Sequence, residues 1–287
     1  MISTTDAQRA VNDLLWAINS PSLLNDSVGV APLERGDFDQ ERLAHTIAAN
    51  PNRRVGKYFE HLIRFWLAEI RGVTDLEHSR QIRDVKRTIG ELDFLYTDEQ
   101  GRRTHLEIAV KFYLHTPDAD VGGSHFIGPN AADTFDRKMS RLFDHQLPLG
   151  RQHISGITQT IAIVKGRIFY HPNNAVPRSL PAKLSPDHGQ GNWIRQSETR
   201  CFQDQPSDSR FCVLRKPHWL ANEIAAIDDD SLMSKAGIAD CLERHFQQNN
   251  HPVLVSQLEM SRGHYEEANR LFVVNDEWPV RSVSSPT

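Results

Sequence analysis

The segment Gly90–Phe112 reads GELDFLYTDEQGRRTHLEIAVKF. Two β-favouring runs, ELDFLY and the longer THLEIAVKFYL, flank the polar stretch from Asp98 to Gly101. A short polar turn that contains glycine, placed between two such runs, is typical of a β-hairpin. The segment therefore predicts two neighbouring strands joined by a tight turn.

The two faces of this predicted hairpin differ in chemistry. Because side chains alternate along a strand, Glu91 and Asp93 share one face, and Glu107, Ala109 and Lys111 share one face of the second strand. The opposite face is apolar and consists of Leu92, Phe94, Ile108, Val110 and Phe112. Three acids and a lysine on one side carry a cost in desolvation and repulsion unless a cation or solvent relieves it.

Working outward from the hairpin, the sequence predicts a mixed α/β protein. Hydrophobic spacing of three and four predicts helices over residues 4–19, 40–49, 53–70, 131–146 and 230–247. Extended runs predict two strands within 154–170 around Lys165-Gly166, a strand over 211–216 and another over 270–274. The stretches 20–37, 115–130 and 172–210 are rich in turn-forming residues, and we expect them to be connections.

The same pattern suggests three regions. Residues 51–170 contain the hairpin and its nearest predicted elements and form the expected core. Residues 1–50 form an N-terminal helical extension, and residues 171–287 form a C-terminal α+β extension packed on the core.

Composition excludes several classes of protein. The chain has 287 residues, 39% hydrophobic and 24% charged, with a net charge of −4, which is unlike a basic nucleic-acid coat protein. Its three cysteines have no CxxC spacing, so we expect reduced thiols and no zinc site. We see no secretory signal, no membrane-length apolar stretch, and no Walker or Rossmann glycine motif. We therefore expect a soluble cytoplasmic protein with no membrane partner.

The order of elements around the hairpin resembles the PD-(D/E)XK nuclease superfamily. The matching residues are Glu60 in the FEHLIRFWL helix, Asp93 in GELDF, and Glu107 and Lys111 in LEIAVKF. The likeness spans roughly residues 53–170 and implies a restriction-endonuclease-like core, a mixed sheet flanked by helices. More narrowly, EIAVKFYL, GPNAADTFDRK and EANRLFVVNDEWP resemble a bacterial family of unknown function assigned to that superfamily, domain-of-unknown-function family 1853.

This resemblance implies a site that hydrolyses phosphodiesters with Mg²⁺ or Mn²⁺. By resemblance, Asp93 and Glu107 are metal ligands and Lys111 is the catalytic lysine. Glu60 is an accessory acid that holds either a metal-bound water or the lysine itself, and Glu91 can add a ligand. Hard carboxylates bind Mg²⁺, which lowers the pKa of a bound water, and a nearby lysine can stabilise the developing anion.

Ala109 departs from the superfamily pattern, which usually has an acid two residues before the lysine. The nearest acid is Glu107, one pleat repeat earlier, which shifts its Cα by roughly 6–7 Å along the strand. A glutamate recovers part of that reach, and Glu91 or Glu60 could substitute. The alternative is that metal binding has been lost.

Several of these residues have a plainer interpretation. The hairpin charges could form a solvated cross-strand ion pair, and Glu60 could pair with Arg64 one helical turn later. Candidate nucleic-acid contacts are basic residues at two helices, which could equally be solvated: Arg53, Arg54, Lys57, Lys138 and Arg141. The run Arg80–Arg87 is basic and is usually a solvated face.

The expected function is a Mg²⁺-dependent nuclease that acts on DNA or, as a second choice, RNA. The alternative is a catalytically inactive module of the same fold that binds nucleic acid or a protein partner, and a homodimer is compatible with either. Two-carboxylate glycoside chemistry fits less well, because it does not use a lysine such as Lys111.

Overall fold

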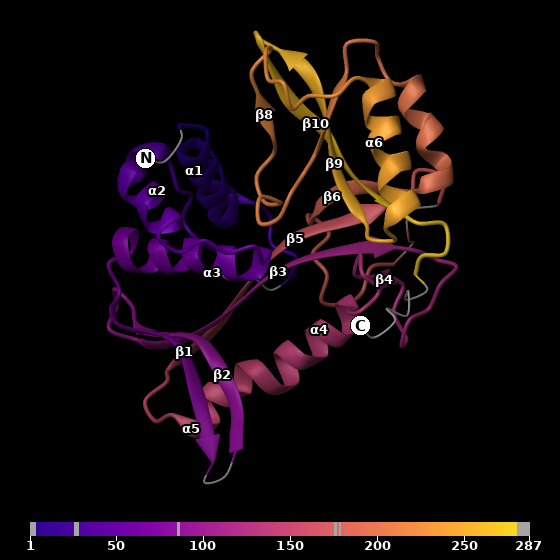
Figure 1. Cartoon of the computed structure of the whole chain (residues 1–287). Coiled ribbons are helices and arrows are strands. Elements are labelled where there is room, and N and C mark those ends of the chain that lie inside the picture. The colour runs from indigo at the N-terminus through magenta and orange to yellow at the C-terminus, as the bar shows by residue number, and fades with distance from the viewer. Residues whose placement is uncertain (1–3, 26–28, 85–86, 175–176, 178, 280–287) are drawn as a thin grey trace.

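A computed structural model describes residues 4–25, 29–84, 87–174, 177 and 179–279. Within these residues the chain builds one mixed sheet with the strand order β1-β2-β3-β5-β6-β10-β9-β7 (Figure 1). Its centre is parallel, and its two ends are antiparallel. The central strands are β3 (Arg103–His115), β5 (Gln159–Tyr170), β6 (Gly189–Arg195) and β10 (His264–Val274).

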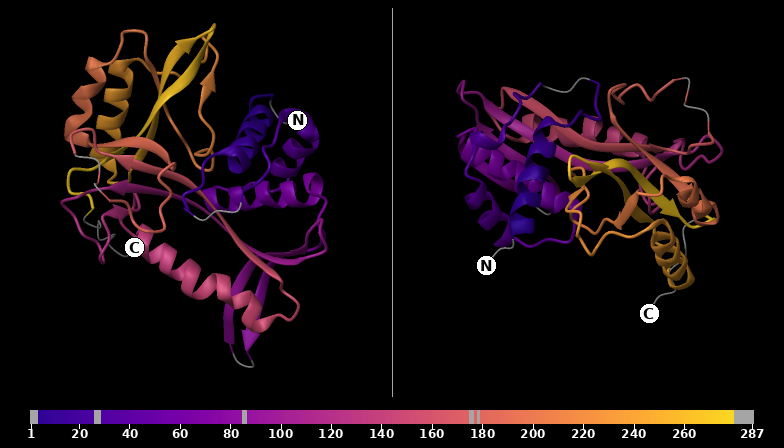
Figure 2. Two further views of the ribbon diagram at one scale, coloured as in Figure 1. Left: turned by 180° about the vertical axis from the view of Figure 1, so that it is seen from behind. Right: turned by 90° about the horizontal axis from the view of Figure 1, so that it is seen from above.

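The flanking strands extend this sheet on both sides. On one side lie β2 (Arg87–Thr97) and β1 (Thr74–Asp84), and on the other lie β9 (Val253–Ser261) and β7 (Arg210–Val213). Two short strands complete it, β4 (Phe126–Ile127) on β3 and β8 (Ile224–Ala225) on β10. Figure 2 shows the β1–β2 hairpin projecting from the body of the molecule.

Helices cover both faces of the central strands (Figures 1 and 2). One face carries α1 (Thr4–Asn19), α2 (Gln40–Ala48) and α3 (Val55–Phe65), which continues into the π turn η2 (Trp66–Ile70). The other carries one long helix made of α4 (Phe135–Ser140), the π turn η3 (Arg141–Gln146) and α5 (Leu147–His153). The remaining helical segments are η1 (Arg35–Asp37), η4 (Gln196–Asp204) and α6 (Lys235–Gln248).

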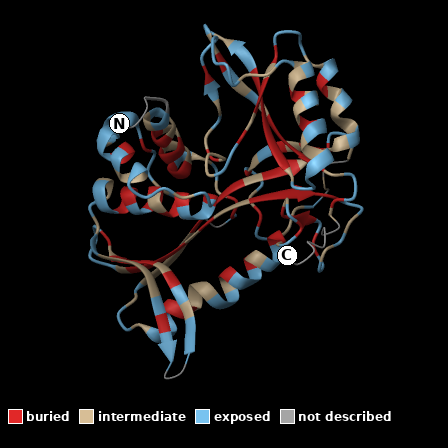
Figure 3. Ribbon diagram, in the orientation of Figure 1, coloured by how far each residue is buried: buried red, intermediate tan, exposed pale blue. Residues whose placement is uncertain are grey.

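Strand β3 is buried on both faces, as Figure 3 shows by its red colour. Its even-numbered side chains, such as Leu106 and Leu114, belong to the core shared with α1 and α3. Its odd-numbered side chains Ala109 and Tyr113 pack with Phe135, Met139 and Leu142 of the long helix. A strand covered on both sides is apolar along most of its length, so the acid and the lysine on β3 stand out.

The predicted mixed α/β fold is confirmed, as are the helices near 4–19, 40–49 and 53–70 and the hairpin formed by β2 and β3. The helix predicted over 230–247 is α6, which begins at Lys235. The strand-like run 211–216 becomes β7, and the run 270–274 is the second half of β10.

The prediction of two strands around Lys165-Gly166 is wrong, because β5 runs unbroken through both residues. Lys165 is buried and donates to the carbonyls of Ile18 and Ser20 near the end of α1. Gly166 lies opposite Lys111 with φ of 144°, and a Cβ there would be 1.7 Å from the Lys111 carbonyl oxygen. The glycine therefore permits close approach of two strands instead of making a turn.

The helix predicted over 131–146 begins later and ends later than expected. The Thr134 hydroxyl accepts from the Arg137 N–H at 3.3 Å and caps the start, and the helix then continues to His153. Pro148 is tolerated because it falls in the first turn of α5, directly after the π turn η3.

Two segments expected to lie outside the sheet form strands. The excursion 172–210 contains β6, where Trp193 and Ile194 are buried, and the helical turn η4. The described part of the basic run 80–87 belongs to β1 and β2, since Arg80 and Arg83 pair through their backbones with β2. Because these side chains are polar, a prediction based on hydrophobicity does not identify the segment as part of a sheet.

The strands of this one sheet are distributed along the chain from residue 74 to residue 274. The division into a core and two extensions remains a prediction. In the described residues, no helix is both long enough and apolar enough to cross a membrane.

Candidate functional site

The centre of the candidate site is the point where β2 and β3 separate, which we call the β2–β3 fork. The backbone ladder between these strands covers Phe94–Thr97 against Arg103–Leu106. Beyond it, carboxylates replace backbone carbonyls as acceptors. The Ile108 N–H donates to Asp93 Oδ2 at 2.9 Å, and the Asp93 N–H donates to Glu107 Oε1 at 3.3 Å. The fork therefore holds two of the predicted acids next to each other.

Glu107 is fully buried and has protein donors at both oxygens. Oε1 accepts from His105 Nε2 at 2.8 Å in addition to the Asp93 N–H, and Oε2 accepts from the Gln146 amide at 2.6 Å. His105 is also fully buried, on the same face of β3. This set of bonds fixes the orientation of the Glu107 carboxylate before any ligand arrives.

Asp93 has an altered acidity. Burial, followed by the negative charge of Glu107, raises the pKa of Asp93 to about 7. In the described residues, no lysine or arginine nitrogen lies within 4 Å of the Asp93 or Glu107 carboxylates. Two adjacent acids without a lysine or arginine partner are a place where a bound cation would relieve repulsion.

Lys138 is the basic residue connected to these acids. Its Nζ donates to Gln146 Oε1 at 2.9 Å, and the Gln146 amide in turn donates to Glu107. Both residues lie on the long helix α4–η3–α5, which crosses this face of β3. Burial and the positive charge of Lys111 lower the pKa of Lys138. Gln146 was not predicted, because an amide 39 residues away from Glu107 leaves no local signal.

Lys111 points to a different partner. Its Nζ donates to Asp133 Oδ2 at 2.7 Å, and the Tyr113 hydroxyl lies 3.4 Å from the same oxygen. Asp133 directly precedes the Thr134 cap of α4, so the start of the long helix sets its position. The structure thus separates the predicted lysine from the predicted acids and brings Lys138 toward them.

Glu60 lies on α3, near the fork. It is buried, pairs with Lys57 at 2.7 Å and contacts His78, and the Ser79 hydroxyl lies 3.5 Å away. Its partners are therefore Lys57 and His78, not Arg64. Its charge contributes, after burial and Glu107, to the raised pKa of Asp93. His78 was missed because β1 was not predicted.

The other predicted residues lie around this centre. Glu91 is exposed on β2 opposite Gln81 of β1. Arg141 is exposed on η3, and its charge lowers the pKa of Lys138 after larger effects from burial and Lys111. Arg53 and Arg54 are exposed at the start of α3.

A cavity of about 790 Å³, which we call the basic cavity, opens beside Lys111. It lies between the start of α3, the edge of β3, the loop before α4 and the loop after β7. Its charged lining consists of Arg53, Arg54, Lys111, Arg215, Lys216 and one acid, Asp133. Arg215, Lys216 and the cavity residue Trp219 were not predicted as functional, although the basic pair ends the strand predicted over 211–216.

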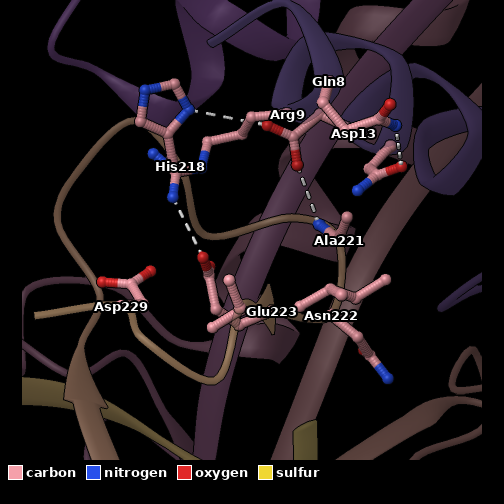
Figure 4. Close-up of a pocket in the computed structure, with 12 residues that line it drawn as sticks. Gln8, Arg9, Asp13, His218, Ala221, Asn222, Glu223 and Asp229 are labelled. Carbon is pink, nitrogen blue, oxygen red and sulfur yellow. Dashed lines mark hydrogen bonds and ion pairs between the residues drawn. The ribbon is translucent and has the colours of Figure 1, made fainter. Parts of the chain in front are cut away.

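A second, smaller pocket of about 330 Å³ lies between α1 and the loop 217–229 (Figure 4). Its polar groups pair mainly with one another. Asp13 accepts from the Tyr58 hydroxyl at 2.8 Å and from the Ala221 N–H at 2.9 Å, and Arg9 pairs with Glu223 at 2.9 Å. Burial, reinforced by Asp13, raises the pKa of Tyr58. These contacts fasten α1 to the loop.

The acids at the fork offer the donor chemistry that a hard cation takes. Asp93 and Glu107 supply carboxylate oxygens, and Mg²⁺ keeps several waters and is usually held by one or two carboxylates together with substrate phosphates. Among the described residues, no three or more His, Cys, Asp or Glu side chains are arranged to hold a metal ion.

Comparison with known proteins gives a family. A search of curated proteins and a search of solved structures each returned no match. A family model described as "Domain of unknown function (DUF1853)" matches residues 12–274, which include the fork, the basic cavity and every strand of the described sheet. The chain therefore belongs to the DUF1853 family.

Proposed function

We propose that this protein is a Mg²⁺-dependent phosphodiesterase of the PD-(D/E)XK type that acts on nucleic acid, with DNA as the first choice over RNA. The observation that carries this proposal is the pair of adjacent acids at the β2–β3 fork, Glu107 fully buried and Asp93 half-buried. Asp93 has a pKa of about 7, and no lysine or arginine in the described residues forms an ion pair with either acid.

The geometry supports the following roles. Asp93 and Glu107 would hold Mg²⁺, or Mn²⁺ in its place, while His105 and Gln146 keep the Glu107 carboxylate in position. The metal would polarise the phosphate and make water a better nucleophile at neutral pH. Lys138, whose pKa is lowered by burial and by Lys111, is placed to orient the attacking water or to take its proton.

Lys111 fits a phosphate contact better than a role beside the metal. Its amine lies next to Asp133 on the lining of the basic cavity, and a lysine there offers a point charge to a phosphate oxygen. Glu60 would act from α3 by keeping its negative charge near Asp93. Glu91, exposed on β2, could bind only a solvated ion.

The resemblance to the PD-(D/E)XK superfamily supports the proposal independently of the geometry, through the sequence order of Glu60, Asp93, Glu107 and Lys111. Ala109, in the usual position of the second acid, packs with the long helix. The long helix instead brings Gln146 to Glu107, with Lys138 bonded to Gln146. The hydrogen bond from Gln146 holds the Glu107 carboxylate, which lies two residues before the usual position of the second acid, in a fixed orientation.

A rival proposal is an inactive module that binds nucleic acid or a protein partner. It is favoured by the fact that both Glu107 oxygens already accept from protein donors, as structural buried acids do. In that case the fork stabilises the fold and the basic cavity alone carries the function.

Cleavage of plasmid and oligonucleotide substrates with Mg²⁺ or Mn²⁺ separates these proposals. The wild-type chain should cut, and Asp93→Asn should not, while Lys138→Met and Lys111→Ala should retain reduced activity. The exposed Arg244 on α6 provides a matched control, so Arg244→Ala should cut like the wild type. Equal activity in all variants, or none in the wild type with any metal and nucleic acid, would reject the nuclease proposal.

A further inference from the structure

We infer that the basic cavity binds an unpaired, single-stranded segment of nucleic acid. The position of this segment beside the cleaved bond rests on the proposed function, whereas the binding itself does not. The inference stands on the charge of the cavity, its size, its aromatic wall and its place along the edge of β3.

The charge of the cavity is strongly positive and mostly uncompensated. Five basic side chains and one acid line it, a balance of +4 at neutral pH. Lys111 pairs with Asp133, but in the described part of the chain no carboxylate lies within 4 Å of Arg53, Arg54, Arg215 or Lys216. Exposed cations that converge without acids repel one another, and a phosphate backbone relieves that repulsion while releasing its counterions.

The size of the cavity favours a single strand over a duplex. A volume of about 790 Å³ falls within the range of pockets that enclose a small organic ligand, roughly 300–1,000 Å³. A short run of nucleotides can enter such a space, whereas a base-paired double helix cannot.

An aromatic residue forms part of the wall. Trp219 is half-buried, and its Nε1 donates to the Leu214 carbonyl at 3.0 Å. Its ring meets Phe112 edge-on with centroids 5.7 Å apart, and Lys216 Nζ lies 4.8 Å from the Trp219 ring centroid. A fixed indole beside cations is suited to stack one base of any sequence, as single-strand binding surfaces do.

The cavity is aligned with the acids. Lys111 and Glu107 lie on the same face of β3, four residues apart, which is about 13 Å along a strand. Over this stretch β5 pairs with one edge of β3, while in the described residues the other edge has strand partners only at its ends, β2 and β4. A nucleic-acid strand that leaves the cavity along this edge of β3 would reach Asp93. The substrate should therefore carry an unpaired end or flap.

Fluorescence anisotropy of the full-length protein in EDTA tests the binding without any cleavage. The probes are labelled oligothymidylate, labelled oligouridylate and a blunt duplex of the same length. The double variant Arg54→Ala/Arg215→Ala should bind the single strands at least about tenfold more weakly. Its salt slope should fall by about 1.4, because each lost contact to a single strand contributes about 0.7.

Arg244→Ala, at an exposed position of α6 that is not part of the cavity lining, is the control and should bind like the wild type. The melting temperature of the double variant should match the wild type, since both arginines are exposed. Weaker binding of the duplex than of either single strand supports the inference. Unchanged single-strand affinity in the double variant, or a duplex that binds as tightly as a single strand, overturns it.

The same experiment keeps the two proposals apart. If the wild type binds single strands through Arg54 and Arg215 but does not cut with Mg²⁺ or Mn²⁺, the nuclease proposal fails and the cavity assignment stands. If the wild type cuts and the double variant both cuts and binds equally well, the cavity assignment fails and the nuclease proposal stands.

Discussion

Glu267 and Glu107 are both glutamates of the same sheet with buried carboxylates, but their surroundings differ. Glu267 on β10 pairs with Arg270 through two bonds of 2.8 and 2.7 Å and also accepts from Ser256 and the Glu223 N–H. Arg270 uses its other donors on the carbonyls of Trp219, Leu220 and Ala221. Charge and hydrogen bonding are both satisfied within the protein.

Glu107 on β3 has hydrogen-bond donors but, within the part of the chain that the structure describes, no arginine or lysine partner within 4 Å, and a second acid lies beside it. The comparison separates two uses of a buried carboxylate. A complete ion pair such as Glu267–Arg270 holds a loop to a strand. An acid pair without a lysine or arginine partner, such as Asp93–Glu107, retains unfavourable charge, which a ligand can relieve.

The largest effect should come from breaking the complete pair. Arg270→Met should lower the free energy of unfolding by about 3–5 kcal/mol, because Glu267 would remain buried without its partner. Urea denaturation measures this change, with Arg244→Met as the control on an exposed helix. Adding Glu267→Leu to Arg270→Met should recover part of the loss. A single variant as stable as the wild type would show that the pair contributes little.

At the fork, removing one charged group should lower activity and leave stability unchanged. Asp93→Asn should reduce Mg²⁺-dependent cleavage by about 1,000-fold, since removing one ligand costs several kcal/mol of transition-state stabilisation. Its melting temperature should not fall, because the amide still accepts from the Ile108 N–H and one negative charge is gone. Single-turnover cleavage and calorimetry measure the two quantities. A large loss of stability would mean that Asp93 is structural.

The two lysines should differ in which kinetic constant they change. Lys138→Met should lower kcat by about 100-fold, the scale of a lost proton-transfer or orienting group, with a smaller change in KM. Lys111→Met should mainly raise KM, because its amine lies on the cavity lining. Steady-state kinetics at several substrate concentrations separates these results. If instead Lys111→Met lowered kcat and Lys138→Met mainly raised KM, Lys111 would be the lysine that acts beside the metal.

The smallest expected effect is a coupling between pH and Mg²⁺. With its pKa raised to about 7, Asp93 keeps its proton in the folded state up to neutral pH, whereas in the unfolded chain it releases it near pH 4. Its contribution to stability therefore falls as pH rises from about 4 to about 7. Mg²⁺ competes with that proton and should bind more tightly at pH 8 than at pH 6.

Thermal unfolding with and without Mg²⁺ measures this coupling. At a tenfold excess over Kd, Mg²⁺ should raise the melting temperature by about 3 °C at pH 8 and by less at pH 6. Asp93→Asn should show no such difference. An equal shift at both pH values would mean that Mg²⁺ does not bind at the protonated acid.

Local patterns in the sequence were enough to predict β2, β3 and the positions of Asp93 and Glu107, because alternation along a strand fixes which side chains share a face. They were not enough to predict β1, whose polar and basic residues do not look like a strand. They also misjudged Gly166, since a glycine that allows two strands to approach looks the same as a glycine in a turn.

The parts of the site that escaped prediction come from distant segments. Gln146 reaches Glu107, and Lys138, predicted only as a nucleic-acid contact, reaches Gln146, because the helix stays continuous through the π turn η3 and past Pro148. Arg215, Lys216 and Trp219 reach Lys111 from about 100 residues away, since β7 and β3 belong to one sheet. Contacts of this kind depend on the order of strands, which no local spacing encodes.

The hydrogen bonds from Arg270 to the loop after β7 have a further consequence, for the rate at which a ligand associates. By holding the carbonyls of Trp219, Leu220 and Ala221, the Arg270 side chain fixes the loop that carries Arg215 and Lys216. Because this side of the basic cavity is already fixed, the protein needs no rearrangement before a nucleic-acid strand enters. Association should therefore be a single step, with an observed rate that rises linearly with strand concentration and slows steeply as salt screens the cavity.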